Sequence, residues 1–300
     1  MIAVARLAPA VIALAATLSG CASSSAVDAT AIKVVTTVTQ VTALTRAVAA
    51  GSPVQLTALA QPGDDPHAFE PRPSDIAALA SSKLVIKSGA GLDHWIDGPV
   101  ASASSAQVLD LSTFVSLRPG DEGQDPHWWY DADNAKKATD AIADRLGAID
   151  PANRQRYLDN ATAEKGRLDA ADRDVHAAID PIPVAQRLFV ANHDAFNYFL
   201  ARYDITLVGD IIPSTDTLSA IRPADTARLI QAIRDQHVKA IFTETTLDPG
   251  VATQVAQETG ARVFDGKLYA DAIGGPGTPG ETLEGAIAEN GRQVAAGLRS

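Results

Sequence analysis

The chain has 300 residues and a formal net charge of −11, because 36 acidic side chains outnumber 25 basic ones. A nucleic acid-binding protein needs a basic surface against the phosphate backbone, so this charge balance argues against such a partner. Cys21 is the only cysteine, which excludes internal disulfides, thiolate metal sites and a cysteine nucleophile elsewhere in the chain. The length suits two domains of ordinary size.

Residues 1–21 have the pattern of a signal peptide. Arg6 is the only charge ahead of an apolar, Ala-rich run over residues 7–18, which is too short to span a bilayer. The run ends in Leu18-Ser19-Gly20-Cys21, and small residues directly before a cysteine resemble the lipobox of bacterial lipoproteins. This resemblance implies export, cleavage before Cys21 and attachment of lipid to its sulfur. The alternative is an uncleaved apolar N-terminus with a chance cysteine.

In residues 22–150, short β-branched runs alternate with longer amphipathic runs. Strands are expected at residues 32–38, 54–59, 84–87 and 108–111, and helices at residues 42–50, from Ser74 onward, and at 133–147. Ser74 follows Pro73 and is a favourable residue for capping its helix, while Gly147 is expected to end the helix that begins at Asp133. Strands that alternate with helices predict a parallel sheet with helices on its faces.

The same alternation returns in residues 181–300. Strands are expected at residues 188–191, 205–208, 240–243 and 262–264, and helices at residues 223–236, 249–259 and 281–298. The sequence therefore predicts an α/β protein with an N-terminal lobe (22–150) and a C-terminal lobe (181–300). Each lobe is expected to contain a mostly parallel sheet flanked by helices.

Residues 151–180 are expected to form one long connecting helix between the lobes. Pro151 suits the first turn of a helix, whereas Pro181 and Pro183 prevent its continuation. A straight helix of this length would run roughly 42 Å at 1.5 Å per residue. Its charges are spread around the whole circumference, as on a helix that bridges domains. The alternative is two shorter helices broken near Gly166.

Three of the six histidines lie in stiff loops near the ends of predicted strands. His67 and His127 each follow a proline, and His193 follows the first strand of the second half. In open α/β sheets, ligands bind beyond the carboxyl ends of the strands, and neutral imidazole is a good zinc ligand. One histidine in such a place is more often a surface residue, but three at equivalent points indicate a metal site.

Several motifs follow one another and cover nearly all of residues 22–300. They are Pro66-His67 with Glu70-Pro71-Arg72-Pro73-Ser74-Asp75, Gly89-Ala90-Gly91-Leu92-Asp93-His94-Trp95, Asp125-Pro126-His127-Trp128-Trp129, His193-Asp194-Ala195-Phe196-Asn197-Tyr198-Phe199, Ala240-Ile241-Phe242-Thr243-Glu244 and Leu268-Tyr269-Ala270-Asp271-Ala272-Ile273-Gly274. Together, and with the lipobox in front, they resemble the motifs of the zinc- and manganese-type solute-binding lipoproteins of ABC transporters.

The resemblance implies a set of metal ligands. His67 and His127 match the two ligands from the first lobe, and His193 matches the third, where zinc members have His and many manganese members have Glu. Asp271 matches the carboxylate ligand from the second lobe; without the resemblance it would be interpreted as a loop-capping residue. Three imidazoles and one carboxylate suit zinc, whereas manganese, the alternative, prefers more oxygen ligands.

The resemblance also implies a function without catalysis. The expected protein is a monomer that captures a divalent transition metal, Zn²⁺ or alternatively Mn²⁺, in the cleft between the lobes and delivers it to the membrane permease of an ABC transporter. The metal is then the transported ligand. With lipid on Cys21, the protein would be anchored to the outer face of the cytoplasmic membrane.

The chain departs from the family pattern in three places, and two other functions compete. One departure is Trp129-Tyr130-Asp131-Ala132, which replaces the usual aliphatic residue and proline. Residues 117–124 contain no histidine, where zinc members often carry a His-rich loop, and residues 214–223 are longer than the usual connection. A zinc-dependent hydrolase could use Glu70 or Glu244 as general base, but four protein ligands would close the site to water and the chain lacks a His-Glu-x-x-His helix. A surface adhesin that needs metal only for its structure is the other alternative. His94 lies in a loop where the family has no ligand, and His176 and His237 are expected to be solvated.

Overall fold

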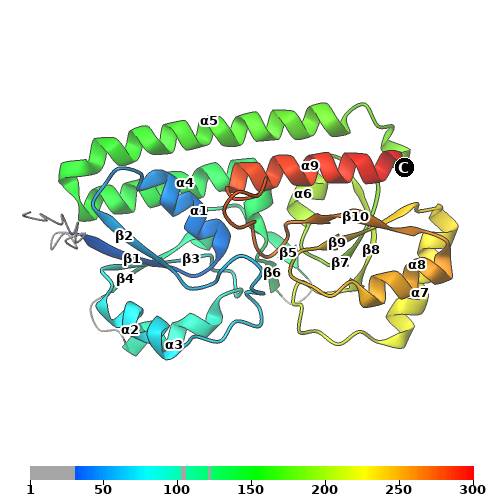
Figure 1. Cartoon of the computed structure of the whole chain (residues 1–300), viewed down its shortest axis with the longest axis horizontal. Coiled ribbons are helices and arrows are strands. Elements are labelled where there is room, and N and C mark those ends of the chain that lie inside the picture. Colours follow the sequence, from blue (N-terminus) through cyan, green and yellow to red (C-terminus); the bar gives the residue numbers. More distant parts are fainter. Residues whose placement is uncertain (1–30, 103–105, 121–122) are drawn as a thin grey trace, which may run out of the picture.

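The structure, a computed structural model, describes residues 31–102, 106–120 and 123–300. The predicted signal peptide and Cys21 lie outside these residues. Two α/β lobes lie side by side, and one long helix runs along both of them (Figure 1). Within the described residues, no helix combines the length and the hydropathy that crossing a membrane would require.

The N-terminal lobe is built on a parallel sheet with the strand order β2–β1–β3–β4. Its strands are β1 (Ile32–Thr36), β2 (Val54–Ala58), β3 (Leu84–Lys87) and β4 (Gln107–Asp110). Helices α1 (Thr39–Val48) and α4 (Ala132–Ile149) cover one face, and α2 (Pro73–Ser81) and α3 (Asp97–Ser102) cover the other (Figure 1). Successive residues of β1 point to opposite faces, so Val34 and Val35 belong to two different cores.

The C-terminal lobe has the same design. Its strands pair in parallel, β7 (Leu188–His193) with β8 (Thr206–Ile212) and β9 (Ala240–Glu244) with β10 (Arg262–Leu268). The two pairs meet along β7 and β9, where the rings of Phe189 and Phe242 stack 4.8 Å apart. Helices α6 (Asn197–Arg202), α7 (Pro223–Gln236), α8 (Gly250–Thr259) and α9 (Leu283–Arg299) pack around these strands. The predicted fold class of two α/β lobes is therefore confirmed.

Residues 151–180 form one helix, as predicted, and it is not broken at Gly166. A 3₁₀ turn at Pro151–Asn153 leads into α5 (Arg154–Ile179), which spans both lobes above α4 and α9 (Figure 1). The expectation of a helix that is charged all round is incomplete, because α5 has one narrow buried seam. This seam consists of Tyr157, Ala161, Glu164, Leu168, Ala171, Val175 and Ile179. The spacing of three and four residues lets α5 pack on the helices of both lobes.

Several short elements do not follow from the sequence pattern. β5 (Arg118–Gly120) and β6 (Gly123–Asp125) form an antiparallel hairpin ahead of His127. Single-turn 3₁₀ helices lie at His94–Ile96, Leu111–Thr113, Trp128–Tyr130 and Val184–Gln186. Segments of three residues are too short for hydrophobic periodicity to reveal.

Several predicted helix boundaries are wrong, and the helix expected at residues 42–50 is α1, Thr39–Val48. Arg72, not Ser74, occupies the N-cap of α2, Pro73 is the first helical residue, and the Asp75 carboxylate accepts the Arg72 backbone N–H at 2.8 Å. Gly147 does not end its helix, because α4 continues to Ile149. A Cβ at Gly147 would lie 3.0 Å from Cγ of Arg154, so the glycine allows the start of α5 to pack closely against the end of α4.

Candidate metal centre

The structure brings the four predicted ligands together between the lobes. His67 lies between β2 and α2, His127 follows the β5–β6 hairpin, His193 is the last residue of β7, and Asp271 follows β10. Side chains at or beyond the carboxyl ends of parallel strands converge at one edge of each sheet. The cleft forms where these two edges face each other.

The spacing of the four side chains fits one metal ion. One potential ligand atom from each lies within 4.8 Å of the others, and no other group of three or more His, Cys, Asp or Glu in the described residues meets this condition. Nε2 of His127 and Nε2 of His193 each lie 3.1 Å from an oxygen of Asp271, and Nε2 of His67 lies 3.7 Å from Oδ1 of Asp271. Ligand atoms on a tetrahedral zinc with bonds of about 2.0–2.1 Å are roughly 3.3 Å apart.

Five buried polar atoms at this point have no hydrogen-bond partner. They are Nε2 of His67, His127 and His193 and both carboxylate oxygens of Asp271. The 3.1 Å approaches to Asp271 lack the alignment of a hydrogen bond. Buried polar atoms are normally paired, because leaving them unpaired costs about 1–3 kcal/mol each. Five such atoms converging on one point form a candidate donor set for a cation.

Carboxylates on the far side of the imidazoles orient two of them. Nδ1 of His127 lies 2.8 Å from Oδ1 of Asp125, and Nδ1 of His193 lies 2.8 Å from Oε1 of Glu244. Both carboxylates are almost completely buried. A carboxylate at Nδ1 keeps a proton there and directs Nε2 to the metal, as in carboxylate–histidine–metal arrangements.

The same carboxylates shift the pKa values of the centre in the protein without metal. Burial lowers the pKa of His127, but the hydrogen bond to Asp125 and the negative charges of Asp125 and Asp271 outweigh it and raise the pKa to about 9. Burial also opposes the charge on His193, yet Glu244 and Asp271 hold its pKa well above 6.5. Burial raises the pKa of Asp271, but the neighbouring imidazoles outweigh this effect and hold the pKa well below its usual range. A metal ion bound at these nitrogens would therefore compete with protons for them.

The loop that carries Asp271 belongs to the C-terminal half but is held by the N-terminal lobe. The backbone oxygen of Ala270 accepts the indole N–H of Trp129 at 3.3 Å and the side-chain amide of Gln40 at 3.1 Å. The N–H of Ile273 donates to the hydroxyl of Thr39 at 3.0 Å. These buried contacts fix the carboxylate opposite the imidazoles of His67 and His127.

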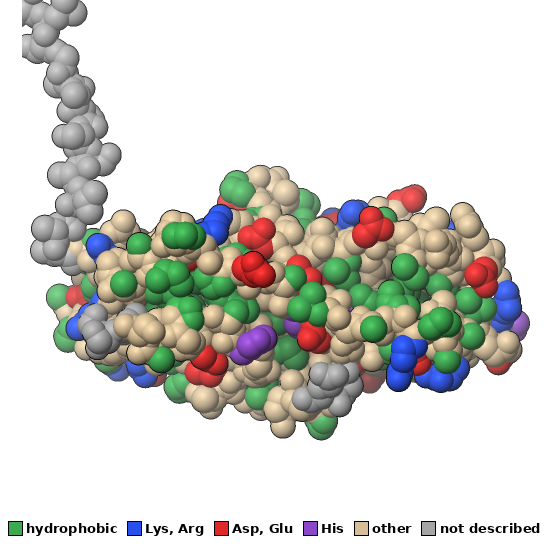
Figure 2. All heavy atoms as spheres, turned by 90° about the horizontal axis from the view of Figure 1, so that it is seen from below, with side chains coloured by type: hydrophobic (Ala, Val, Ile, Leu, Met, Phe, Trp, Pro, Cys, Tyr) green, Lys and Arg blue, Asp and Glu red, His purple; other side chains and the backbone are tan. Residues whose placement is uncertain are grey.

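His67 is the predicted ligand nearest to solvent. Its side chain is 7% exposed, whereas those of His127, His193 and Asp271 are 0% exposed. A surface hollow of about 140 Å³ lies above it, between the N-terminal lobe and the C-terminal lobe. Its walls include His94, Gln124 and Pro126 from the N-terminal lobe and Thr215, Asp216 and Leu218 from the C-terminal lobe. In the space-filling view, histidine and acidic side chains meet near the middle of this face (Figure 2).

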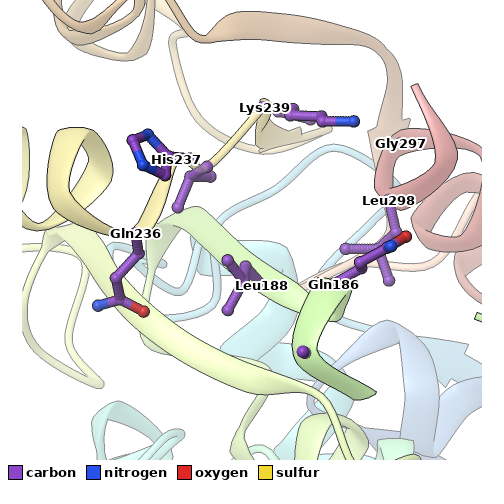
Figure 3. Close-up of a pocket in the computed structure, with 10 residues that line it drawn as sticks. Gln186, Leu188, Gln236, His237, Lys239, Gly297 and Leu298 are labelled. Atoms are coloured by element: carbon purple, nitrogen blue, oxygen red, sulfur yellow. The ribbon is translucent and has the colours of Figure 1, made fainter. Parts of the chain in front are cut away.

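A second hollow, of about 200 Å³, lies at the other edge of the C-terminal lobe (Figure 3). Leu188, the first residue of β7, lines it together with His237 and Lys239, whereas His193 ends the same strand in the cleft. It therefore lies at the amino end of the strands, on the opposite side from the metal centre. His237, like His94 and His176, lies outside the cluster as expected.

The sequence also contains a signal that the prediction did not use, the repeat of Asp-Pro-His. In Asp65-Pro66-His67 the aspartate Oδ1 accepts the backbone N–H of the histidine at 2.9 Å, and in Asp125-Pro126-His127 the same bond is also 2.9 Å long. Two turns of the same type thus fix the two predicted ligands of the N-terminal lobe. Glu244, considered above as a general base, instead contacts His193, and Glu70 is exposed on the surface.

Known proteins are similar over nearly the whole chain. Residues 34–297 match the family described as zinc-uptake complex component A, periplasmic. The manganese-binding lipoprotein MntA of Halalkalibacterium halodurans is 30% identical over 251 residues, which are 83% of each chain. The iron-binding protein YfeA of Yersinia pestis is 29% identical over 252 residues, covering 82% of this chain and 80% of that protein.

A solved structure gives the same result for the fold. The periplasmic zinc-binding protein TroA of Treponema pallidum is similar with a TM-score of 0.82 and 25% identity, covering 88% of this chain and 98% of TroA. The family match includes both lobes and the loops that carry all four clustered side chains. The chain therefore belongs to the zinc-uptake complex component A family, the substrate-binding proteins of metal ABC transporters.

Proposed function

We propose that the protein captures one divalent transition-metal ion with His67, His127, His193 and Asp271 and carries it to a membrane permease. The observation that supports this most directly is the convergence of five unpaired buried ligand atoms at one point. Each lobe contributes to the set, so the ion would link the lobes when it binds. The metal is the cargo of this protein.

Zinc is the proposed preferred ion. Three imidazole nitrogens and a carboxylate match tetrahedral zinc, whereas manganese prefers more oxygen and binds a given site more weakly in the usual order of divalent ions. Manganese is the second candidate because relatives of similar identity are named for manganese, and two relatives are named for iron. The neutral nitrogen ligand at His193 favours zinc between these candidates.

Direct binding measurements test both statements. The protein should be purified without added metal, analysed for its elements, stripped with a chelator and titrated with zinc and with manganese. We expect one ion per chain, and a loss of well over tenfold in affinity, or ~1.4 kcal/mol, in His67→Ala and in His193→Ala. Unchanged titrations in both variants would rule out this site, whereas uptake of manganese ahead of equimolar zinc would overturn only the zinc preference.

The partner and the location are also proposals. We infer that an ABC permease receives the metal and that lipid on Cys21 anchors a monomeric protein to the outer face of the cytoplasmic membrane. Relatives named as lipoproteins of ABC transporters support this. Intact-mass measurement of the membrane fraction tests the anchor: an unmodified Cys21 there would contradict it, and Cys21→Ser should release the protein.

Catalysis by a bound zinc has little support in the geometry. A catalytic zinc keeps an open position for water and needs a nearby general base. Here four side chains converge on the ion position, and Glu244 is hydrogen-bonded to His193. We therefore propose binding and transfer without turnover, which predicts that the zinc-loaded protein hydrolyses neither esters nor peptides.

A further inference from the structure

Each Asp-Pro-His turn also contacts the opposite lobe. While one oxygen of Asp65 holds the backbone of His67, the other accepts the hydroxyl of Thr217 at 2.7 Å. In the second turn, the other oxygen of Asp125 accepts the side-chain amide of Asn197 at 3.1 Å. Both donors come from the C-terminal lobe. A single carboxylate thus joins each N-terminal histidine to the facing lobe.

The two contacts differ in their exposure to solvent. Asp125 is 0% exposed, and its backbone oxygen also accepts the hydroxyl of Tyr198 at 2.8 Å. The contact between Thr217 and Asp65 is only partly buried and lies at the rim of the cleft, beside His67. The inner contact cannot open without exposing the core. The rim contact can open alone, and it lies next to the most exposed ligand.

Thr217 belongs to a turn that hydrogen bonds within the C-terminal lobe hold in place. The backbone oxygen of Ser214 accepts the N–H of Asp194, the neighbour of His193, at 3.2 Å. Within the turn, the hydroxyl of Ser214 accepts the N–H of Asp216 at 3.1 Å and hydrogen-bonds the hydroxyl of Ser219 at 3.0 Å. The turn is therefore a stiff extension of the C-terminal lobe that starts beside one metal ligand and ends on the loop of another.

The turn also brings negative charge to His67. Oδ1 of Asp216 lies 3.8 Å from Nδ1 of His67 and accepts the N–H of Leu218 at 2.9 Å. A cation coordinated by Nε2 would make Nδ1–H of the same ring a better donor, which strengthens its attraction to a carboxylate. Metal in the centre and the turn over the rim therefore favour each other.

We propose that Thr217, presented by the turn over residues 214–219, is an interlobe latch that controls how fast bound metal leaves. Its hydroxyl joins the C-terminal lobe to Asp65 and through Asp65 to the backbone of His67. The inference deepens the proposed function and rests on it. Thr217 is a positioning residue, because it acts on the ion through His67. It also gives a role to the longer segment of residues 214–223.

The latch should affect release much more than capture. Thr217→Val removes the hydroxyl at nearly constant volume and leaves all four ligands in place. A hydrogen bond to a charged group is strong enough for its loss to speed dissociation by about tenfold. The association rate should stay within about twofold, because differences between closely related complexes lie mostly in the dissociation rate.

The experiment measures zinc and manganese dissociation after rapid mixing of the loaded protein with excess chelator. Thr217→Ser keeps the hydroxyl and should restore a rate close to that of the wild type. Thr162→Val is the matched control, because that hydroxyl bonds only within α5, to the oxygen of Leu158 at 2.9 Å. Asp65→Ala combined with Thr217→Val should release no faster than Asp65→Ala alone, since both changes break the same contact.

The outcomes separate the latch from the binding site. Fast release in Thr217→Val, with wild-type stoichiometry and recovery in Thr217→Ser, supports the latch. A Thr217→Val protein that releases metal as slowly as Thr162→Val overturns the latch and leaves the proposed function intact. Fully additive effects of Asp65→Ala and Thr217→Val also overturn it. A wild-type protein that binds no divalent ion overturns the proposed function and the latch together.

Discussion

His127 and His193 are each held at Nδ1 by a carboxylate that is almost inaccessible to water. Asp125 and Glu244 therefore have two effects on the centre: they fix the orientation of the rings and add negative charge close to the ion. Such partners make imidazole a stronger donor to a metal. The affinity of the site should depend on these two acids almost as much as on the ligands themselves.

Glu244→Gln tests this dependence at one residue. Glutamine can still accept a hydrogen bond from Nδ1 of His193, but the negative charge is lost, so we expect zinc affinity to fall by roughly 10–100-fold. Glu258→Gln, the same change on the exposed surface of α8, should leave the affinity unchanged. Titration calorimetry on the stripped proteins measures both. Equal affinities in the two variants would show that the charge of Glu244 does not act on the metal.

The third ligand position should determine the preference for zinc over manganese. His193→Glu replaces nitrogen with oxygen and should narrow the gap between the two ions. Oε1 of Glu244 lies 2.8 Å from Nδ1 of His193. A glutamate in place of His193 would therefore face Glu244, and two close carboxylates repel each other. The double variant His193→Glu with Glu244→Gln should therefore fold better than His193→Glu alone and show the change in metal preference more clearly. A zinc-to-manganese affinity ratio that stays at the wild-type value in both variants contradicts the assignment.

At this scale the sequence predicts single side chains better than their partners. The three histidines stand out because prolines or strand ends stiffen their loops, and the structure places them together. Asp271 could be assigned only through the family resemblance, since an aspartate in a loop usually caps the backbone. Thr217 and Asp65 are 152 residues apart, and no local pattern predicts that they meet.

The long helix α5 joins the lobes through its buried seam. Near its C-terminal end, Val175 packs against α9 at Gly291, where an added Cβ would lie 2.5 Å from Cγ2 of the valine. That distance is shorter than carbon atoms tolerate, so glycine is required for the helices to approach this closely. Gly166 on α5 has no such neighbour, since a Cβ added there would have nothing within 4 Å.

Two glycine-to-alanine substitutions should therefore change stability in opposite directions. Gly291→Ala should lower the free energy of unfolding by about 1–3 kcal/mol, because overcrowding outweighs the gain in helix propensity. Gly166→Ala should raise it by up to about 1 kcal/mol, the usual advantage of alanine in a helix interior. Denaturant unfolding of the metal-free protein compares them. Stabilisation by Gly291→Ala would mean that α5 and α9 are not tightly packed there.

Element length decides how well the sequence predicts the fold. The boundaries of α7 agree with the prediction, because Pro223 starts the helix and a long periodic run follows. The β5–β6 hairpin has strands of three residues, which carry no periodic signal. Gly147 has the local pattern of a helix end, but its role depends on Arg154 in the next helix, a contact that local patterns do not contain.

The proposed ion position lies at the junction of three parts of the molecule: the two lobes and the Asp271 loop, which starts in the C-terminal lobe and contacts the N-terminal lobe. In the metal-free cleft, the raised pKa values of His127 and His193 and the lowered pKa of Asp271 favour protonated imidazoles beside an ionised carboxylate. These groups lie close enough for their charges to compensate one another, with Nε2 of His127 and of His193 each 3.1 Å from an oxygen of Asp271. Metal binding replaces protons with a divalent cation, so both states of the cleft have compensated charge.

Metal affinity should therefore rise steeply with pH through the neutral range. A metal must displace the proton of His127, whose pKa is raised to about 9, and of His193, whose pKa is well above 6.5. Below the lower of these two pKa values, each displaced proton makes the affinity roughly tenfold stronger per pH unit.

The stability of the metal-free protein should change with pH in the opposite sense. A pKa raised above its unfolded value of about 6.5 adds stability that is complete below that pH and is lost as the pH rises through about 9. Calorimetry near pH 7 in buffers of different ionisation enthalpy should show between one and two protons released per zinc bound, and His237→Gln, a change on the surface, should give the same number. Affinity that stays constant between pH 6 and 8 would contradict competition between protons and metal at these histidines.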